Sequence, residues 1–531
     1  MSHLAVVARA ADSGPRARRR AVITGAALSL LIGTIPACGP QDPATAASES
    51  THRDGGMAGD QAAPAADRFA RILPWRAINL VGPTDLIWDE YDYRPAAQGG
   101  HREEIDATLA RLKSLGVRQV QIQTMYAWSV ESAPQPAQSV VYLRPGYRVD
   151  DPSTWGPVPR TRRGDMGLLP YLPSSVPAHW DQPVPRRTPV ELGQKAEQIL
   201  GELLDAVGRA GLVPVLKSEI YLVVAEDAYD FSGDFNYTDP SRGFDAFYAQ
   251  YQDHLVRMTR LAARHGAAMM ILGTETPYVA GAGQSTFADG SRMSSRQALI
   301  AGKWRELIAA VRRAATAESR PDLLFGYTEI NPFWEGRYAS GETPVPVWSR
   351  VPFWDELDVV GINFYLPGRW SDGAGKYDRD PRTADEMVAY GETHDFASDT
   401  IPNLADMRRF FVEQKGYDLK HKPVIFTEDG CTSTPTGAAN PAAPPFLLER
   451  AAPDFTEQRN LYEAHFKLVD KHGAGWLGGL GFWQVTPTRR WGGAFSATNT
   501  DSYSKAAAYF SFLDTPTESV IKEYFSRPYS E

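Results

Sequence analysis

The sequence predicts a single α/β domain folded as a (β/α)8 barrel, with long loops at the C-terminal ends of the strands. Eight short runs of apolar and β-branched residues alternate with segments of helical periodicity between residues 77 and 513. Several helical segments are followed directly by a glycine, the residue type that most often ends a helix. No GxGxxG or P-loop pattern follows the first strand. An open doubly wound sheet is the alternative architecture.

The predicted elements follow this alternation from one end of the domain to the other. We expect strands at residues 77–81, 117–124, 212–217, 267–274, 323–328, 358–364, 422–427 and 479–483. We expect helices at residues 101–115, 190–210, 244–265, 295–316, 404–415, 457–472 and 504–513, and a helical turn at 353–357. The long connections follow strands two, five, six and seven, and connections of this length in a compact domain usually carry function.

The first 70 residues have the composition of an export segment and a linker. Within residues 1–38, four arginines at positions 16–20 precede a short apolar run, which is too short for a comfortable membrane span and predicts a signal peptide. Its end, Ile35 to Cys38, resembles a lipobox, so we expect lipidation of Cys38; cleavage nearby with an unmodified cysteine is the alternative. Residues 39–70 predict a flexible tether, and residues 71–531 form the folded domain. We therefore expect a bacterial cell-surface or periplasmic lipoprotein, exported by the general or the twin-arginine route.

Composition excludes some classes of partner. The net charge of −9 provides no basic excess for nucleic acid. The 13 tryptophans and 23 tyrosines offer flat faces that suit sugar rings. Cys431 is expected to be a small packing residue. Without HExxH or calcium-loop patterns, we expect no metal and no cofactor, and we expect a monomer.

Two glutamates end predicted strands. Glu275 follows the fourth strand and Glu428 ends the seventh, 153 residues later, which corresponds to three βα units. Strand ends carry the active site in a (β/α)8 barrel, so the two carboxylates are expected to face each other across the cavity. Such a pair suits retaining glycoside hydrolysis, in which one carboxylate attacks the anomeric carbon and the other exchanges a proton. The alternative is that each glutamate is a solvated residue at the start of a loop.

Other strand ends carry groups that can bind a sugar. Tyr365 follows the sixth strand, where its hydroxyl can donate a hydrogen bond to the nucleophile. Trp483 ends the eighth strand, where its ring can support the sugar. Glu219 and Glu329, at the ends of the third and fifth strands, can bind sugar hydroxyls or pair with arginines.

Four motifs carry a resemblance to a known group of enzymes. GTE before residue 276, FWDELDVVGINFYLP from residue 353, KPVIFTEDG from residue 422 and GFWQ from residue 481 resemble clan A retaining glycoside hydrolases. The similarity covers roughly residues 77–490 and is strongest to glycoside hydrolase family 113, whose members are mainly endo-β-1,4-mannanases. The resemblance implies that Glu275 is the acid/base, Glu428 the nucleophile, Tyr365 its partner and Trp483 the platform.

The sequence departs from that pattern at three strand ends. Thr274 stands where many clan A enzymes have an asparagine that binds the sugar 2-hydroxyl. Strand three ends in Lys217-Ser218-Glu219 in place of a histidine motif, and Asp429-Gly430-Cys431 follows the nucleophile position. We expect Thr274 and Asn363, together with the groups above, to contact substrate.

The sequence therefore favours a secreted or surface-tethered retaining glycosidase that cleaves a β-linked polysaccharide or oligosaccharide, with a mannan-like substrate preferred. The alternative is a non-catalytic glycan-binding barrel of an uptake system. The two differ in electrostatics, because an acid/base must hold a proton near neutral pH. We expect the ionised Glu428 to raise the pKa of Glu275 and Tyr365 to keep Glu428 ionised.

Overall fold

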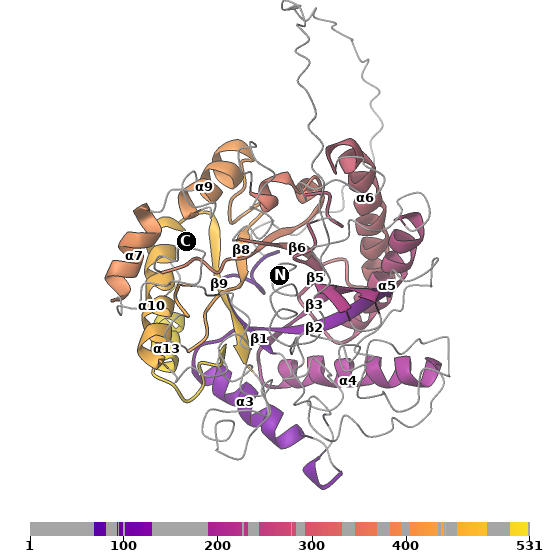
Figure 1. Ribbon diagram of the computed structural model, residues 1–531. Helices are drawn as coiled ribbons and strands as arrows, with labels where there is room; N and C mark the ends of the chain where they lie inside the picture. The colour runs from indigo at the N-terminus through magenta and orange to yellow at the C-terminus, as the bar shows by residue number, and fades with distance from the viewer. Residues whose placement is uncertain are drawn as a thin grey trace, which may run out of the picture. The chain divides into compact units, whose positions relative to one another are not determined.

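The computed structural model describes residues 68–80, 93, 95–98, 101–129, 189–225, 228–231, 244–277, 279–282, 293–331, 346–368, 383–393, 403–433, 437–439, 441, 454–485 and 510–528. In this part of the chain, eight parallel strands pair in sequence order and the last pairs with the first, so the sheet closes into a barrel (Figure 1). The barrel strands are β1 (Trp75–Leu80), β2 (Gln119–Ser129), β3 (Val213–Ala225), β5 (Met269–Thr274), β6 (Leu324–Ile330), β7 (Val359–Asn363), β8 (Val424–Glu428) and β9 (Leu477–Val485). The predicted (β/α)8 class is confirmed.

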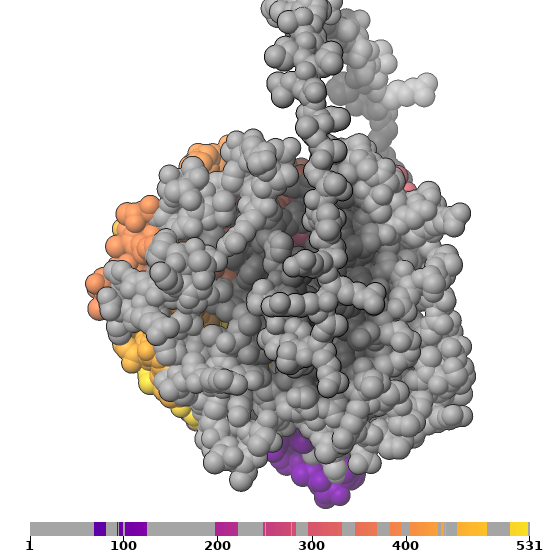
Figure 2. All heavy atoms as spheres, in the orientation of Figure 1, coloured from indigo at the N-terminus to yellow at the C-terminus, as the bar shows by residue number. Residues whose placement is uncertain are grey.

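Helices surround the barrel on its outside (Figure 1). They are α3 (Arg102–Ser114), α4 (Pro189–Arg209), α5 (Phe244–Arg264), α6 (Met293–Ala317), α7 (Ala384–Thr393), α9 (Leu404–Arg408) with a π-helical continuation (Arg409–Gln414), α10 (Phe455–His472) and α13 (Thr517–Ser526). A 3-10 turn, Trp354–Glu356, lies where the helical turn was predicted. In the space-filling view, the orange helix α7 reaches the surface at the left edge (Figure 2). Among the described residues, no helix combines the length and apolar character needed to cross a membrane.

Three elements differ from the prediction. Strand β3 extends eight residues beyond the predicted end at residue 217 and forms a hairpin with the antiparallel strand β4 (Ala228–Phe231). Helix α7 lies in a segment for which no element was predicted. The helix predicted at residues 504–513 falls mostly outside the described part: residues 504–509 are not described, residue 510 is helical and residues 511–513 are not, and a further helix that was not predicted, α13, begins after Pro516. Phe512 and Leu513, in the segment that precedes α13, are buried in the main core.

The interior of the barrel changes from apolar to polar along the strands. One end holds an apolar cluster that includes Trp75, Val215 and Ile271. Two residues further along β3, the inward position is Lys217, and two beyond that it is Glu219, because side chains alternate along a strand. Inward positions near the carboxyl ends are thus polar and buried, and this end holds the candidate site.

The folded domain begins slightly before the predicted boundary at residue 71. Phe69 and Ile72 are buried in the apolar cluster inside the barrel. Arg68 forms an ion pair with Asp358, which precedes strand β7. These residues therefore belong to the barrel, and the last residues of the predicted tether are packed against it.

Candidate active site

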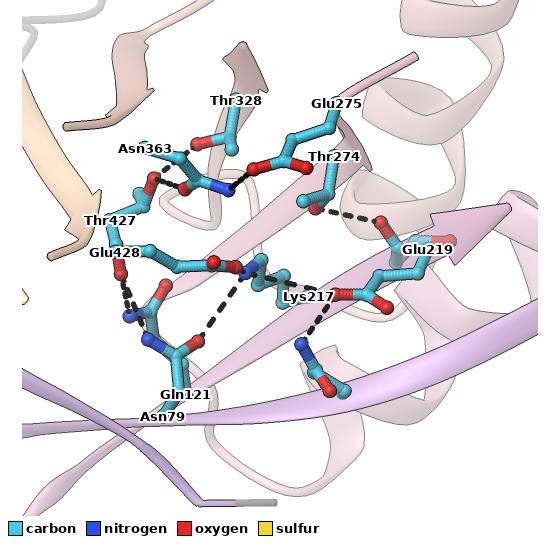
Figure 3. Close-up of polar contacts among 12 residues, drawn as sticks. Asn79, Gln121, Lys217, Glu219, Thr274, Glu275, Thr328, Asn363, Thr427 and Glu428 are labelled. Carbon is cyan, nitrogen blue, oxygen red and sulfur yellow. Dashed lines mark hydrogen bonds and ion pairs between the residues drawn. The ribbon is translucent and has the colours of Figure 1, made fainter. Parts of the chain in front are cut away.

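The two glutamates and their predicted partners lie at the carboxyl end of the barrel. Glu428 is the last residue of β8, Glu275 directly follows β5, and Tyr365 lies two residues beyond β7. Figure 3 shows Glu275 and Glu428 extending from different strands toward a shared network of polar side chains. The structure therefore brings together the side chains that the sequence singled out as the reacting pair.

Glu428 is buried and accepts two strong hydrogen bonds. The hydroxyl of Tyr365 donates to its Oε2 at 2.8 Å, and the ammonium of Lys217 donates to its Oε1. Lys217 is itself fully buried and lies 3.9 Å from Oε1 of Glu219. A buried carboxylate needs such compensation, because an uncompensated charge away from water is costly. This arrangement favours the ionised form of Glu428.

Glu275 has a different environment. Its Oε1 accepts a hydrogen bond of 2.6 Å from the side-chain amide of Asn363, and the amide oxygen of Asn363 in turn accepts one of 2.8 Å from the hydroxyl of Thr427. Thr427 also shares a 2.6 Å hydroxyl–hydroxyl hydrogen bond with Thr328 (Figure 3). These contacts run across three neighbouring strands and fix which way the Asn363 amide faces, so that its N–H points at Glu275.

Burial raises the pKa of Glu275 to about 7. The Asn363 amide and the Lys217 ammonium act in the opposite direction, while the nearby Glu219 adds to the increase in pKa. We expected the charge of Glu428 to cause the increase; the main cause is instead desolvation, with Glu219 as the carboxylate that contributes. A glutamate with this pKa can hold a proton near neutral pH and release it during a reaction cycle.

Lys217 and Tyr365 are perturbed by the same burial. Desolvation lowers the pKa of Lys217 to about 8, although Glu219 and Glu275 oppose this decrease. Desolvation raises the pKa of Tyr365 well above its usual value, and the charge of Glu275 adds to the increase. Tyr365 is thus a neutral hydrogen-bond donor at neutral pH, and Lys217 is a cation that is held in place by the carboxylates around it.

Two residues at these strand ends have left-handed backbone conformations. The φ angle is +50° at Glu275 and +29° at Tyr365. Residues other than glycine adopt this region rarely, and such conformations cluster at functional sites. The backbone therefore departs from ordinary geometry at the predicted acid/base and at the partner of the predicted nucleophile.

The remaining predicted contacts lie at different places in the structure. Glu219 lies within the polar network, where Gln123 donates to its Oε1. Trp483 is partly buried, and the Lys217 ammonium lies 5.5 Å from the centre of its ring. The hydroxyl of Thr274 is buried and donates to the backbone oxygen of Ser218 at 3.1 Å. The sugar-binding roles of Glu219, Trp483 and Thr274 stay predictions.

Glu329 lies on the other face of its strand and is not brought to the pair. Its neighbour Thr328 points into the barrel, whereas the Glu329 carboxylate accepts hydrogen bonds from the Tyr327 hydroxyl at 2.8 Å and the Ile330 backbone at 3.0 Å. Tyr327 packs against Trp304 in the outer layer. The sequence places Glu329 near a strand end but does not show which face it occupies, so the expected contact with sugar has no counterpart in this geometry.

Sequence reasoning missed Lys217 as a site residue. In the sequence, Lys217 stands out only as a departure from a histidine motif, yet it contacts Glu428 and lies near Glu219. A signal was present: polar residues occupy alternate positions of otherwise apolar strands, as Gln119, Gln121 and Gln123 do on β2. Alternate polar positions near strand ends indicate a polar lumen.

Two predictions concern cysteines and metals. Cys431 is buried in the main core cluster, as expected for a packing residue. Cys38 lies outside the described residues. Within the described ranges, no three histidine, cysteine or acidic side chains are grouped in a way that could hold a metal ion.

The fold and a family match together support a glycosidase. Residues 347–504 match the model of Glycoside Hydrolase Family 113, which is less than a third of the chain. The match covers strands β7, β8 and β9, and with them Asn363, Tyr365, Glu428 and Trp483; Glu275 lies outside it. The protein is thus similar over this segment to that particular family, as the sequence motifs imply.

Similar solved structures include β-mannanases and a mannosidase. One is a GH113 β-1,4-mannanase with 17% identity and a TM-score of 0.47, for which the similarity covers 85% of this chain and 99% of that one. Another is the GH113 β-mannanase AaManA from Alicyclobacillus acidocaldarius, with 16% identity, coverage of 86% and 97%, and a TM-score of 0.46. A family 5 mannosidase from Rhizomucor miehei has 13% identity, coverage of 85% and 92%, and a TM-score of 0.43. No curated protein matches the sequence.

Proposed function

We propose that the protein is a retaining glycosidase that cleaves a β-linked, mannan-like polysaccharide by double displacement, with Glu428 as nucleophile and Glu275 as acid/base. The observation that carries the proposal is the unequal environment of the two carboxylates. Glu428 accepts hydrogen bonds from an ammonium and a phenol, whereas burial raises the pKa of Glu275 to about 7. Two carboxyl groups whose environments push their pKa values apart provide one nucleophile and one proton donor.

In the first step, a carboxylate oxygen of Glu428 bonds to the anomeric carbon while the bond to the leaving oxygen breaks. Glu275 transfers its proton to that oxygen. In the second step, Glu275 accepts a proton from water, and the water replaces Glu428 at the anomeric carbon. Lys217 and Tyr365 hold the Glu428 carboxylate in a fixed direction, because each donates to a different oxygen.

The proposed substrate class rests on the match to Glycoside Hydrolase Family 113. Family 113 structures similar to this chain are described as β-1,4-mannanases, and the family match covers the strands that carry the proposed nucleophile and its tyrosine partner. For the cellular location, we propose export and a lipid anchor at Cys38. The proposed location rests on the signal-like residues 1–38. A lipid chain on Cys38 would hold the folded domain at the membrane.

The test uses the wild type with Glu428→Gln and Glu275→Ala, each assayed on mannan and on aryl β-mannosides. Glu428→Gln should lower kcat by several orders of magnitude, because an amide cannot form the glycosyl ester. Glu275→Ala should retain the first step on substrates with good leaving groups, and added azide should yield a β-glycosyl azide. An α-azide would indicate inversion and refute double displacement. Glycan binding without hydrolysis by the wild type would instead identify a binding protein.

A further inference from the structure

A buried histidine–aspartate pair lies directly behind the reacting groups. Nδ1 of His465, on helix α10, lies 2.8 Å from each carboxylate oxygen of Asp429, the residue that follows Glu428. Nε2 of the same ring lies 2.8 Å from the backbone oxygen of Leu366, the residue that follows Tyr365. Both side chains of the pair are at most 1% exposed. Neither residue has a role in the reaction described above.

The partners of the ring determine how many protons the pair holds. A backbone carbonyl only accepts hydrogen bonds, so Nε2 of His465 must carry a proton that it donates to Leu366. A second proton lies between Nδ1 and Asp429, whichever of the two carries it. The pair is therefore neutral as a unit, and its burial avoids the cost of an isolated charge. The edge contact between the ring and Phe364, at 5.4 Å between centroids, further fixes the ring plane.

The two hydrogen-bond partners of His465 belong to two different strand ends. Leu366 directly follows Tyr365 beyond the end of β7, and Asp429 directly follows Glu428 at the end of β8. The same two ends also share a backbone hydrogen bond of 2.6 Å from Phe364 to Glu428. One imidazole thus links the segment that carries the donor of the Tyr365–Glu428 hydrogen bond to the segment that carries its acceptor.

We propose that His465, through Asp429 and Leu366, is a positioning residue that holds Tyr365 and Glu428 in reacting geometry. The inference rests on the proposed function, because it holds that His465 positions Glu428 for its attack on the anomeric carbon. A shift of about 1 Å in a reacting group can lower a rate about 100-fold, so a link between these two strand ends can have a large kinetic effect without touching substrate.

The experiment measures the rate at which Glu428 is labelled by a 2-deoxy-2-fluoro-β-mannobiosyl fluoride. In this step a Glu428 oxygen bonds to the anomeric carbon, and fluoride leaves with the electron pair of the broken bond. Fluoride needs little protonation, so the rate reports the nucleophile more than Glu275. Peptide mass mapping locates the label, and saturation gives binding separately from the rate of attack.

His465→Gln should slow labelling about 100-fold at saturation without weakening binding, because one amide cannot serve both acceptors. Asp429→Asn should slow it by no more than about tenfold, since the amide still hydrogen-bonds a neutral ring. His472→Gln is the matched control, because His472 also lies on α10 and pairs with a carboxylate, Glu392 at 2.7 Å, but lies at the surface. That variant should be labelled at the wild-type rate.

A double-mutant cycle with Tyr365→Phe separates positioning from general loss of structure. If His465 acts through the Tyr365–Glu428 pair, His465→Gln should slow labelling less than about tenfold in the Tyr365→Phe background. His465→Asn carries the same expectation and replaces the glutamine variant if that variant does not fold. Wild-type labelling rates in both His465 variants, or a full 100-fold effect in the Tyr365→Phe background, would each overturn the inference alone. A wild type that is not labelled at Glu428 would overturn the proposed function as well.

Discussion

Replacing Asn363 with leucine should move the alkaline limit of activity to higher pH. The Asn363 amide donates a 2.6 Å hydrogen bond to Glu275 and thereby lowers the pKa of that carboxyl, which burial raises to about 7. A hydrogen bond to a charged group is worth about 1.5–3 kcal/mol. Because one pKa unit corresponds to about 1.4 kcal/mol, the loss of this bond should raise the pKa of Glu275 by about 1–2 units. Leucine has a similar size, so the site should not open to water.

The sign follows from the proposed role of Glu275 as a proton donor. Activity falls when the donor loses its proton, so a higher pKa extends activity upward in pH, from a limit near 7 to about 8–9. The assay is the pH dependence of kcat/KM on mannan-derived oligosaccharides, which reports the free enzyme. Thr427→Ser keeps the hydroxyl that orients the Asn363 amide and should leave the limit in place. A folded Asn363→Leu protein with an unchanged or lower alkaline limit would refute the assignment of that limit to Glu275.

Two further predictions concern the buried lysine and the anchor. Lys217→Met should destabilise the protein by about 3–5 kcal/mol at pH 7 in urea unfolding, because Glu428 and Glu219 lose their buried cation. The loss should shrink toward pH 4 as the carboxylates take up protons; a loss that does not change with pH would show that packing, not charge, is responsible. Cys38→Ala should move the protein from the membrane to the soluble fraction of cells. If the Cys38→Ala variant still sediments with membranes, the proposed lipid anchor at Cys38 is wrong.

The sequence by itself determined the order of elements and the location of the groups that are proposed to react. Apolar runs that alternate with amphipathic helices predict parallel strands, and eight such units favour a closed barrel over an open sheet. Glu275, Glu428 and Tyr365 were found because a carboxylate or phenol at the end of a buried strand stands out against its apolar neighbours. Helix α13, after Pro516, was not predicted; of the helix predicted at residues 504–513, only residues 510–513 are described, and of these only residue 510 is helical.

Only the tertiary structure decided which side chains meet. Strands buried on both faces are apolar on both, so their pattern does not show which residues point into the barrel. This is why Glu329 was expected to contact sugar although it faces the outer layer, and why Lys217 was not expected to contact Glu428. The pKa of Glu275 depends on burial and on contacts with residues that are distant in sequence, such as Asn363, which is 88 positions away. No local sequence pattern encodes such contacts. Strand sequences fix the position of each group along the barrel axis, whereas register and the closure of the barrel fix its neighbours.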